Sequence, residues 1–141
     1  MDTQLVNRSK ALQLALGATA TLAGLDKFFN LLADWPTYLS PFVANMVPIS
    51  ADVLMQIVGI IEIGVGFCIL YAAPILGTYA ASAWLLVVAV NLIIAGHFDV
   101  AVRDVVLAIA ALNLVRSLEL RAIVPASEQA VQLHRQQALS S

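Results

Sequence analysis

The sequence predicts an all-α membrane protein, a bundle of four transmembrane helices with a long outer loop between the first and second helices. Hydrophobic residues make up 61% of the 141 residues and charged residues 11%, against roughly 45–50% and about 25% in soluble globular domains. The mean hydropathy is high, at +0.90. The apolar stretches lack the period-two alternation of strands, and a transmembrane barrel needs more strands than this chain can supply.

Each apolar stretch comes close to the length of about 20 residues that a helix needs to cross a bilayer. The four stretches run at about 10–32, 53–71, 75–96 and 102–123. Pro74 and Gly77 predict a tight turn between the second and third helices, and Gly96 ends the third. We therefore expect one transmembrane domain at 1–124, followed at 125–141 by a polar cytoplasmic tail that is either a surface helix or mobile.

The basic residues predict the orientation of this bundle. Four spans place both termini on one side, and most of the basic residues fall on that side: Arg8, Lys10, Arg116, Arg121 and Arg135. Lys27 and Arg103 fall toward the other side. The positive-inside rule therefore predicts that both termini are cytoplasmic. No cleavable signal peptide is evident, so we expect the first helix to act as its own insertion signal.

The outer loop at 33–52 contains three aromatic residues, Trp35, Tyr38 and Phe42, among three prolines. Aromatic side chains of this kind are typical of the headgroup level of a membrane. Two interpretations remain open: the loop is an aromatic anchor at the interface, or it is a lid over a cavity.

Glu62 lies at the midpoint of the second apolar stretch. An ionisable side chain at mid-membrane is costly, so it normally faces the bundle interior and has a partner. At a rise of 1.5 Å per residue, Glu62 lies roughly 15 Å from the outer face, and Asp26, Lys27 and Asn91 lie roughly 10 Å from it. Lys27 has a long flexible side chain, and we expect it to be the partner of Glu62.

Glycines around Glu62 indicate that its face of the helix is turned inward. Gly59 and Gly66 lie three residues before and four after Glu62, on the same helix face. Small residues let a second helix approach closely. The first helix carries a matching pair, Ala20 and Gly24, with Lys27 on the same stripe.

A second group of polar residues lies at the outer rim. Arg103 and Asp104 begin the fourth helix, close to His97 and Asp99 of the preceding loop. We expect Arg103 to meet Asp26 or Asp99. Together, the side chains of Asp26, His97, Asp99 and Asp104 could be mistaken for a metal site. The helical His/Glu spacing of metalloproteins is absent, however. The group therefore predicts an ion-pair network and no metal.

Several function classes find no support in the sequence. It has no phosphate-binding glycine loop, no nucleophile elbow, and no serine or cysteine beside a plausible base. Cys68 is the only cysteine, which excludes a disulfide within one chain. The net charge of −2 gives no reason to expect a nucleic-acid partner. The sequence identifies no catalytic residue. It favours a protein that is not itself an enzyme, at most an accessory subunit of a membrane oxidoreductase.

Two motifs resemble the DoxX and DoxX-like family of small four-helix membrane proteins. The first is Gly24-Leu25-Asp26-Lys27-Phe28, and the second is the glutamate-glycine segment Gly59–Gly66. The layout of the spans extends the resemblance over about Leu12 to Leu120. Many relatives carry an arginine after the second helix, where this chain has Ala72-Ala73-Pro74-Ile75.

The resemblance implies a multi-pass protein of the bacterial or archaeal cytoplasmic (inner) membrane. Some members of the family are membrane subunits of a thiosulfate:quinone oxidoreductase, and others accompany redox-stress proteins. A quinone as ligand, and a membrane or periplasmic redox protein as partner, are therefore expectations from the resemblance.

Three hypotheses follow for function. The first is a non-catalytic subunit or binding module whose outer-half cavity holds a lipophilic ligand, a quinone or a lipid. That cavity would be lined by Lys27, Glu62 and Asn91, with Asp26 and Arg103 nearby, and covered by the loop of Trp35–Phe42. The second is a membrane-embedded enzyme or proton-coupled carrier that uses Glu62. The third is a structural bundle, or a homo-oligomer, in which the polar groups only determine helix packing.

Overall fold

The computed structural model describes residues 3–140, which contain helices and no strand. This confirms the all-α prediction. The long helices are α1 (Thr3–Asp26), α3 (Ala51–Phe67), α4 (Pro74–Ala95) and α5 (Phe98–Ser140). The shorter elements are a 3-10 helix η1 (Trp35–Tyr38), α2 (Pro41–Met46) and a π-helical turn η2 (Cys68–Ala72) that prolongs α3.

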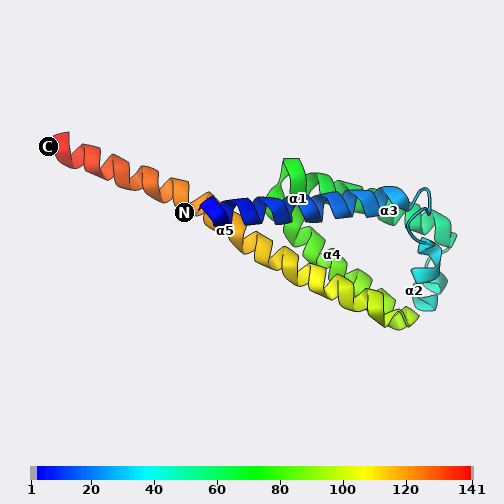
Figure 1. The fold of residues 1–141 in the computed structure, drawn as a ribbon. Helices are drawn as coiled ribbons and strands as arrows, with labels where there is room; N and C mark the ends of the chain where they lie inside the picture. Colours follow the sequence, from blue (N-terminus) through cyan, green and yellow to red (C-terminus); the bar gives the residue numbers. More distant parts are fainter. Residues whose placement is uncertain (1–2, 141) are drawn as a thin grey trace.

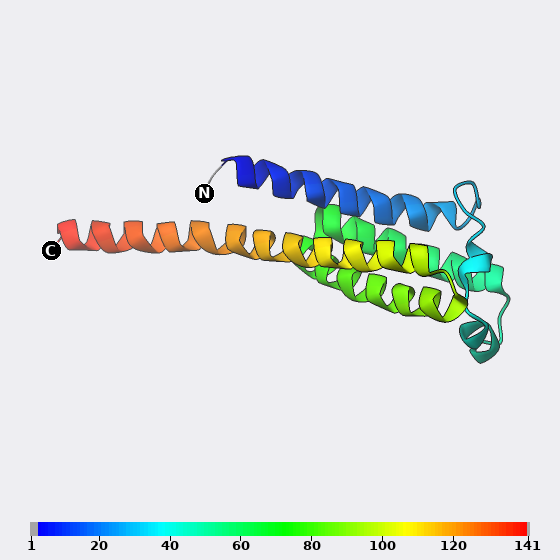
Figure 2. The ribbon, with the colours of Figure 1, turned by 60° about the horizontal axis from the view of Figure 1, so that its bottom comes forward.

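The long helices form two antiparallel pairs (Figure 1). α1 packs mainly on α3, and α4 packs mainly on α5. The pairs meet near the chain termini and diverge toward the opposite end, where η1 and α2 lie between them. We call these the terminal end and the loop end. Figure 2 shows that α5 continues beyond the other helices at the terminal end.

An apolar cluster joins the two pairs near the terminal end. Leu16 of α1 packs with buried residues of α5, and partly buried side chains from α1, α4 and α5 surround them. The buried members are Leu16, Ala111, Leu114 and Leu118, and the surrounding members are Leu12, Ile75 and Leu107. The loop end, by contrast, contains the buried charged residues Asp26, Lys27 and Asp104.

Glycines bring α1 and α3 into backbone contact. A Cβ atom placed on Gly24 would lie 2.5 Å from the carbonyl oxygen of Gly59, and one placed on Gly59 would lie 2.5 Å from that of Gly24. The predicted close approach is therefore confirmed. Gly66, however, faces Gly17 and Thr21, one turn from the expected Ala20.

The first helix differs most from its predicted range. α1 ends at Asp26, although the apolar run continues to Leu32. The chain turns because the backbone N–H groups of Leu31 and Leu32 donate to the carboxylate of Asp26. Asn30 assists with a φ of 51°, in the left-handed region that asparagine tolerates. Asp26 and Lys27 are therefore at the helix end, and the longer helix predicted around them is wrong.

The other helix bounds differ by less, except at the C-terminus. With η2 included, the second helix covers 51–72 against the predicted 53–71, and α4 covers Pro74–Ala95 against 75–96. The expected separate tail is instead a continuation of α5 through Pro125 to Ser140. A proline removes one helical hydrogen bond, but the residues that follow are rich in Ala and Gln, which favour helix.

Two segments among the described residues are long and apolar enough to cross a membrane, by length and composition. They are Ala51–Ala72, which comprises α3 and η2, and Pro74–Ala95, which is α4.

Replacing Gly24 with alanine tests the contact between α1 and α3. The added methyl group would meet backbone atoms of α3, which cannot rotate away, so the helices must separate. We expect Gly24→Ala to lower the free energy of unfolding by about 1–3 kcal/mol, measured by thermal or denaturant unfolding.

Gly64→Ala on α3 is the matched control. A Cβ atom there meets nothing within 4 Å, and alanine is the better helix former by about 1 kcal/mol. Equal losses of stability in the two variants would show that the glycine contact is not what makes Gly24→Ala costly.

Candidate functional site

The centre of the candidate site is an ion pair between α1 and α3. Lys27 Nζ lies 2.6 Å from Glu62 Oε2, and the two side chains are 4% and 15% exposed. Glu62 lies one turn after Gly59, so the glycine contact brings it within reach of the lysine that follows α1. The predicted pairing of Lys27 with Glu62 is confirmed.

Trp35 of η1 covers the lysine of this pair. Lys27 Nζ lies 3.7 Å from the centroid of the Trp35 ring, within the range of a cation–π interaction. The indole Nε1 of Trp35 donates to Asp26 Oδ2 at 2.8 Å. The loop is thus held directly over the buried charge, as the lid interpretation expects.

The other aromatic residues of the loop have different positions. Tyr38 packs on His97, with 4.8 Å between ring centroids. Phe42 is 58% exposed. The interpretations of the loop as an interfacial anchor and as a lid over a cavity both stay predictions.

Asp26 and Asn91 both connect the loop to the helices. Asp26 accepts from Trp35 and from the backbone of Leu31 and Leu32. Asn91 of α4 accepts from the backbone N–H of Ser40 at 3.0 Å and donates to the carbonyl oxygen of Tyr38 at 2.9 Å. Both were predicted to share a site with Glu62, but their hydrogen-bond partners among the described residues lie in the loop.

The rim residues are arranged differently from the prediction. Arg103 bonds its neighbour Asp104, at 3.0 Å between Nη2 and Oδ1, and not the expected Asp26 or Asp99. His97 Nε2 lies 3.1 Å from the carbonyl oxygen of Thr37. Asp99 is exposed and has no hydrogen bond or ion pair to any residue that the structure describes.

Asp104 and Trp84 complete the surroundings of Glu62. Asp104 of α5 is 3% exposed and is close enough to act electrostatically on both Glu62 and Lys27. Trp84 of α4 also lies close to the Glu62 carboxylate. Its Nε1 atom is buried but makes no hydrogen bond of normal geometry to a described residue. Buried indole N–H groups usually have a partner.

Trp84 is the site residue that the sequence reasoning missed. Tryptophan in a membrane protein is concentrated at the two interfaces, whereas Trp84 lies near the middle of the third apolar stretch. This unusual position is a signal that sequence reading can use.

The described residues include no group of three or more His, Cys, Asp or Glu side chains arranged to hold a metal ion.

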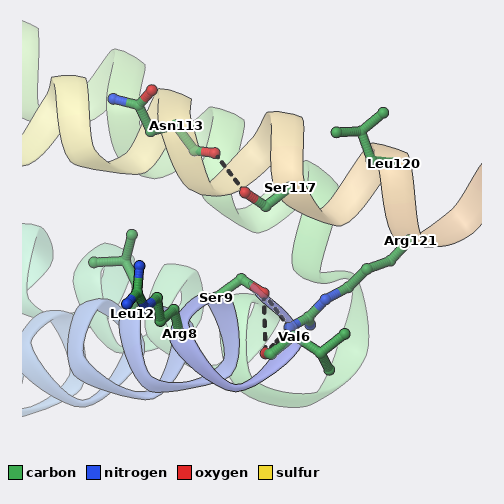
Figure 3. A pocket seen from close by; sticks show the side chains of 8 residues that line it. All are labelled: Val6, Arg8, Ser9, Leu12, Asn113, Ser117, Leu120 and Arg121. Atoms are coloured by element: carbon green, nitrogen blue, oxygen red, sulfur yellow. Dashed lines mark hydrogen bonds between the residues drawn. The ribbon is translucent and has the colours of Figure 1, made fainter. Parts of the chain in front are cut away.

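The cavity expected around Glu62 stays a prediction. A cavity of about 280 Å³ lies instead at the terminal end, between α1 and α5 (Figure 3).

No protein-family model, curated protein or solved structure matches this chain significantly. The resemblance to the DoxX family therefore rests on the two motifs and the helix layout alone.

A double-mutant cycle on Lys27→Met and Glu62→Gln tests the ion pair. Each single substitution leaves one buried group without its partner, which typically costs about 3–5 kcal/mol. We expect the double variant to lose less than the sum of the single losses, in thermal unfolding of the purified protein. Additive losses would contradict a direct interaction.

Arg103→Met is the control for this cycle. The Arg103 side chain is 57% exposed in its pair with Asp104, and exposed pairs contribute about 0–1 kcal/mol. The change should therefore leave the free energy of unfolding nearly unaltered.

Proposed function

We propose that this chain is a four-span integral membrane protein of the inner membrane, with both termini cytoplasmic and the loop end facing outward. α3 together with η2, and α4, are each long and apolar enough to cross a membrane, by length and composition. α1 has no charged residue between Lys10 and Asp26, and α5 has none between Asp104 and Arg116. Exposed apolar side chains continue across both helices: Leu14, Leu22 and Leu25 on α1, and Val102, Val106, Ile109 and Leu112 on α5.

We further propose that the protein is a binding module for a lipophilic ligand that carries a hydrogen-bonding oxygen, of which a quinone is the leading candidate. The observation that carries this proposal is the buried Nε1–H of Trp84, which lies close to the Glu62 carboxylate but makes no hydrogen bond of normal geometry to a residue that the structure describes. Leaving such a donor unsatisfied costs about 1–3 kcal/mol. A carbonyl oxygen of the ligand would supply the missing acceptor.

The surrounding residues suit the same kind of ligand. Lys27 bonds one carboxylate oxygen of Glu62, Oε2, so Oε1 is left to accept from a ligand hydroxyl. Trp35 covers the charged pair and offers an aromatic face. The DoxX resemblance favours a quinone over other lipids, and a membrane or periplasmic redox protein as partner. In this proposal the site binds and orients, and it performs no chemistry of its own.

Cysteine labelling tests the topology. In a Cys68→Ser background, Thr37→Cys lies in the loop and Gln136→Cys lies near the end of α5, and both positions are exposed. With a membrane-impermeant maleimide on intact spheroplasts, we expect only the Thr37→Cys protein to react. The Gln136→Cys protein should react after permeabilisation. Labelling of both in intact spheroplasts, or only of Gln136→Cys, would refute the proposed topology.

Quinone binding tests the ligand site. Both tryptophans of the chain, Trp35 and Trp84, border it, so quenching of their fluorescence by ubiquinone-1 reports on occupancy. Trp84→Phe keeps a ring but removes the donor, and Trp35 remains as the reporter. We expect binding to weaken by about 0.5–1.5 kcal/mol, roughly two- to tenfold.

Tyr79→Phe is the matched control, because Tyr79 lies on the same helix but donates to Glu119, away from the site. Its affinity for ubiquinone-1 should equal that of the parent. A folded variant carrying both Lys27→Met and Glu62→Gln should lose binding. If that variant binds ubiquinone-1 like the parent, the proposed ligand site is wrong and a purely structural role for the pair is favoured.

A further inference from the structure

The cavity at the terminal end has the character of an anion site. It lies between the first turns of α1 and the middle of α5 (Figure 3). Arg8 and Arg121 line it, and its lining includes no acidic residue. Ser9, Asn113 and Ser117 add polar groups to its walls.

Arg121 is held in place across this cavity. Its Nη2 atom donates to the carbonyl oxygen of Val6 and to the hydroxyl of Ser9, which connects α5 to α1 as Figure 3 shows. A guanidinium has five N–H donors, so Nε and Nη1 retain donors for a ligand. The arginine is therefore already oriented before any ligand binds.

Arg8 supplies a second positive charge to the cavity. It is exposed and has no hydrogen bond or ion pair to the residues that the structure describes. Glu119, two residues before Arg121 on α5, accepts a hydrogen bond from Tyr79. Two guanidinium groups at one cavity suit a phosphate, because each can bind its oxygens with paired hydrogen bonds.

Apolar side chains adjoin the charged groups. Leu12 and Leu120 also line the cavity, and Leu120 is 59% exposed. Leu12 lies next to the apolar cluster around Leu16 and Leu114. The cavity therefore offers apolar side chains beside its two arginines, as a lipid joins acyl chains to a charged headgroup.

We propose that this cavity binds the phosphate headgroup of an anionic phospholipid of the inner leaflet, with Arg8 and Arg121 as its cationic ligands. The inference rests on the proposed membrane topology, which places the terminal end at the cytoplasmic surface. Basic pockets between transmembrane helices on that side are suited to anionic headgroups. The apolar wall favours a lipid over a free phosphate ion, which shares the same headgroup chemistry.

The test compares two lipids with identical acyl chains, phosphatidylglycerol and phosphatidylcholine, added to the full chain in mild detergent. Native mass spectrometry measures the fraction of protein that retains each lipid. We expect tighter binding of phosphatidylglycerol, and about fivefold weaker binding after Arg8→Gln, which corresponds to about 1 kcal/mol. Arg121→Gln should weaken it at least as much.

Arg116→Gln is the matched control, since it removes the same charge from α5 outside the cavity. It should bind phosphatidylglycerol like the parent. Equal binding of the two lipids, or equal losses from Arg8→Gln and Arg116→Gln, would overturn the inference. Competition by inorganic phosphate at equal concentration would assign the site to a free ion and also overturn it.

Two further readouts keep the test decisive. Because Arg121 connects two helices, Arg121→Gln can fail to fold, and Arg8→Gln at the exposed rim then carries the result. Ubiquinone-1 binding at the loop end is measured on the same variants and should not change. If the parent protein binds the two lipids equally but still binds ubiquinone-1, only this inference is refuted. If the parent prefers phosphatidylglycerol but does not bind ubiquinone-1, only the proposed quinone site is refuted.

Discussion

A carboxylate in the middle of an apolar helix must have a partner, and the pairing of Glu62 with Lys27 meets this requirement. The contact is possible because Gly24 and Gly59 allow the backbones of α1 and α3 to touch. α1 ends at Asp26, and the side chain of the next residue, Lys27, reaches Glu62 on α3 and lies under Trp35 of the loop. The close helix approach and the loop thus both contribute to the surroundings of this buried pair.

The loop end and the terminal end are stabilised by different interactions. At the terminal end, leucine and alanine side chains pack between α1, α4 and α5. At the loop end the two helix pairs diverge, and buried polar groups take over: Asp26 and Asn91 bind the loop, and Trp35 covers Lys27. Buried polar groups require specific partners, whereas apolar packing tolerates exchange. The loop end is therefore the more exacting part of the fold.

Much of this arrangement was predictable, and the errors have identifiable causes. The pairing of Lys27 with Glu62 followed from depth and side-chain length, and the glycine face followed from helical periodicity. The end of α1 was misplaced because Phe28, Phe29, Leu31 and Leu32 prolong the apolar run, while the turn depends on backbone hydrogen bonds to Asp26. Asn91 bonds Ser40 and Tyr38 of the loop, because level along a helix does not specify which neighbour a side chain meets.

The sequence by itself determined the all-helical class, the two most apolar spanning segments and the need of Glu62 for a cation. These properties depend on composition and on periodicity along the chain, and both can be read without knowing how the helices pack. Only the tertiary structure decided that Trp84 approaches Glu62, that Arg103 bonds Asp104, and that Arg8 and Arg121 line one cavity. Each of these contacts depends on how the helices are placed and rotated relative to one another. A local sequence pattern does not contain that information.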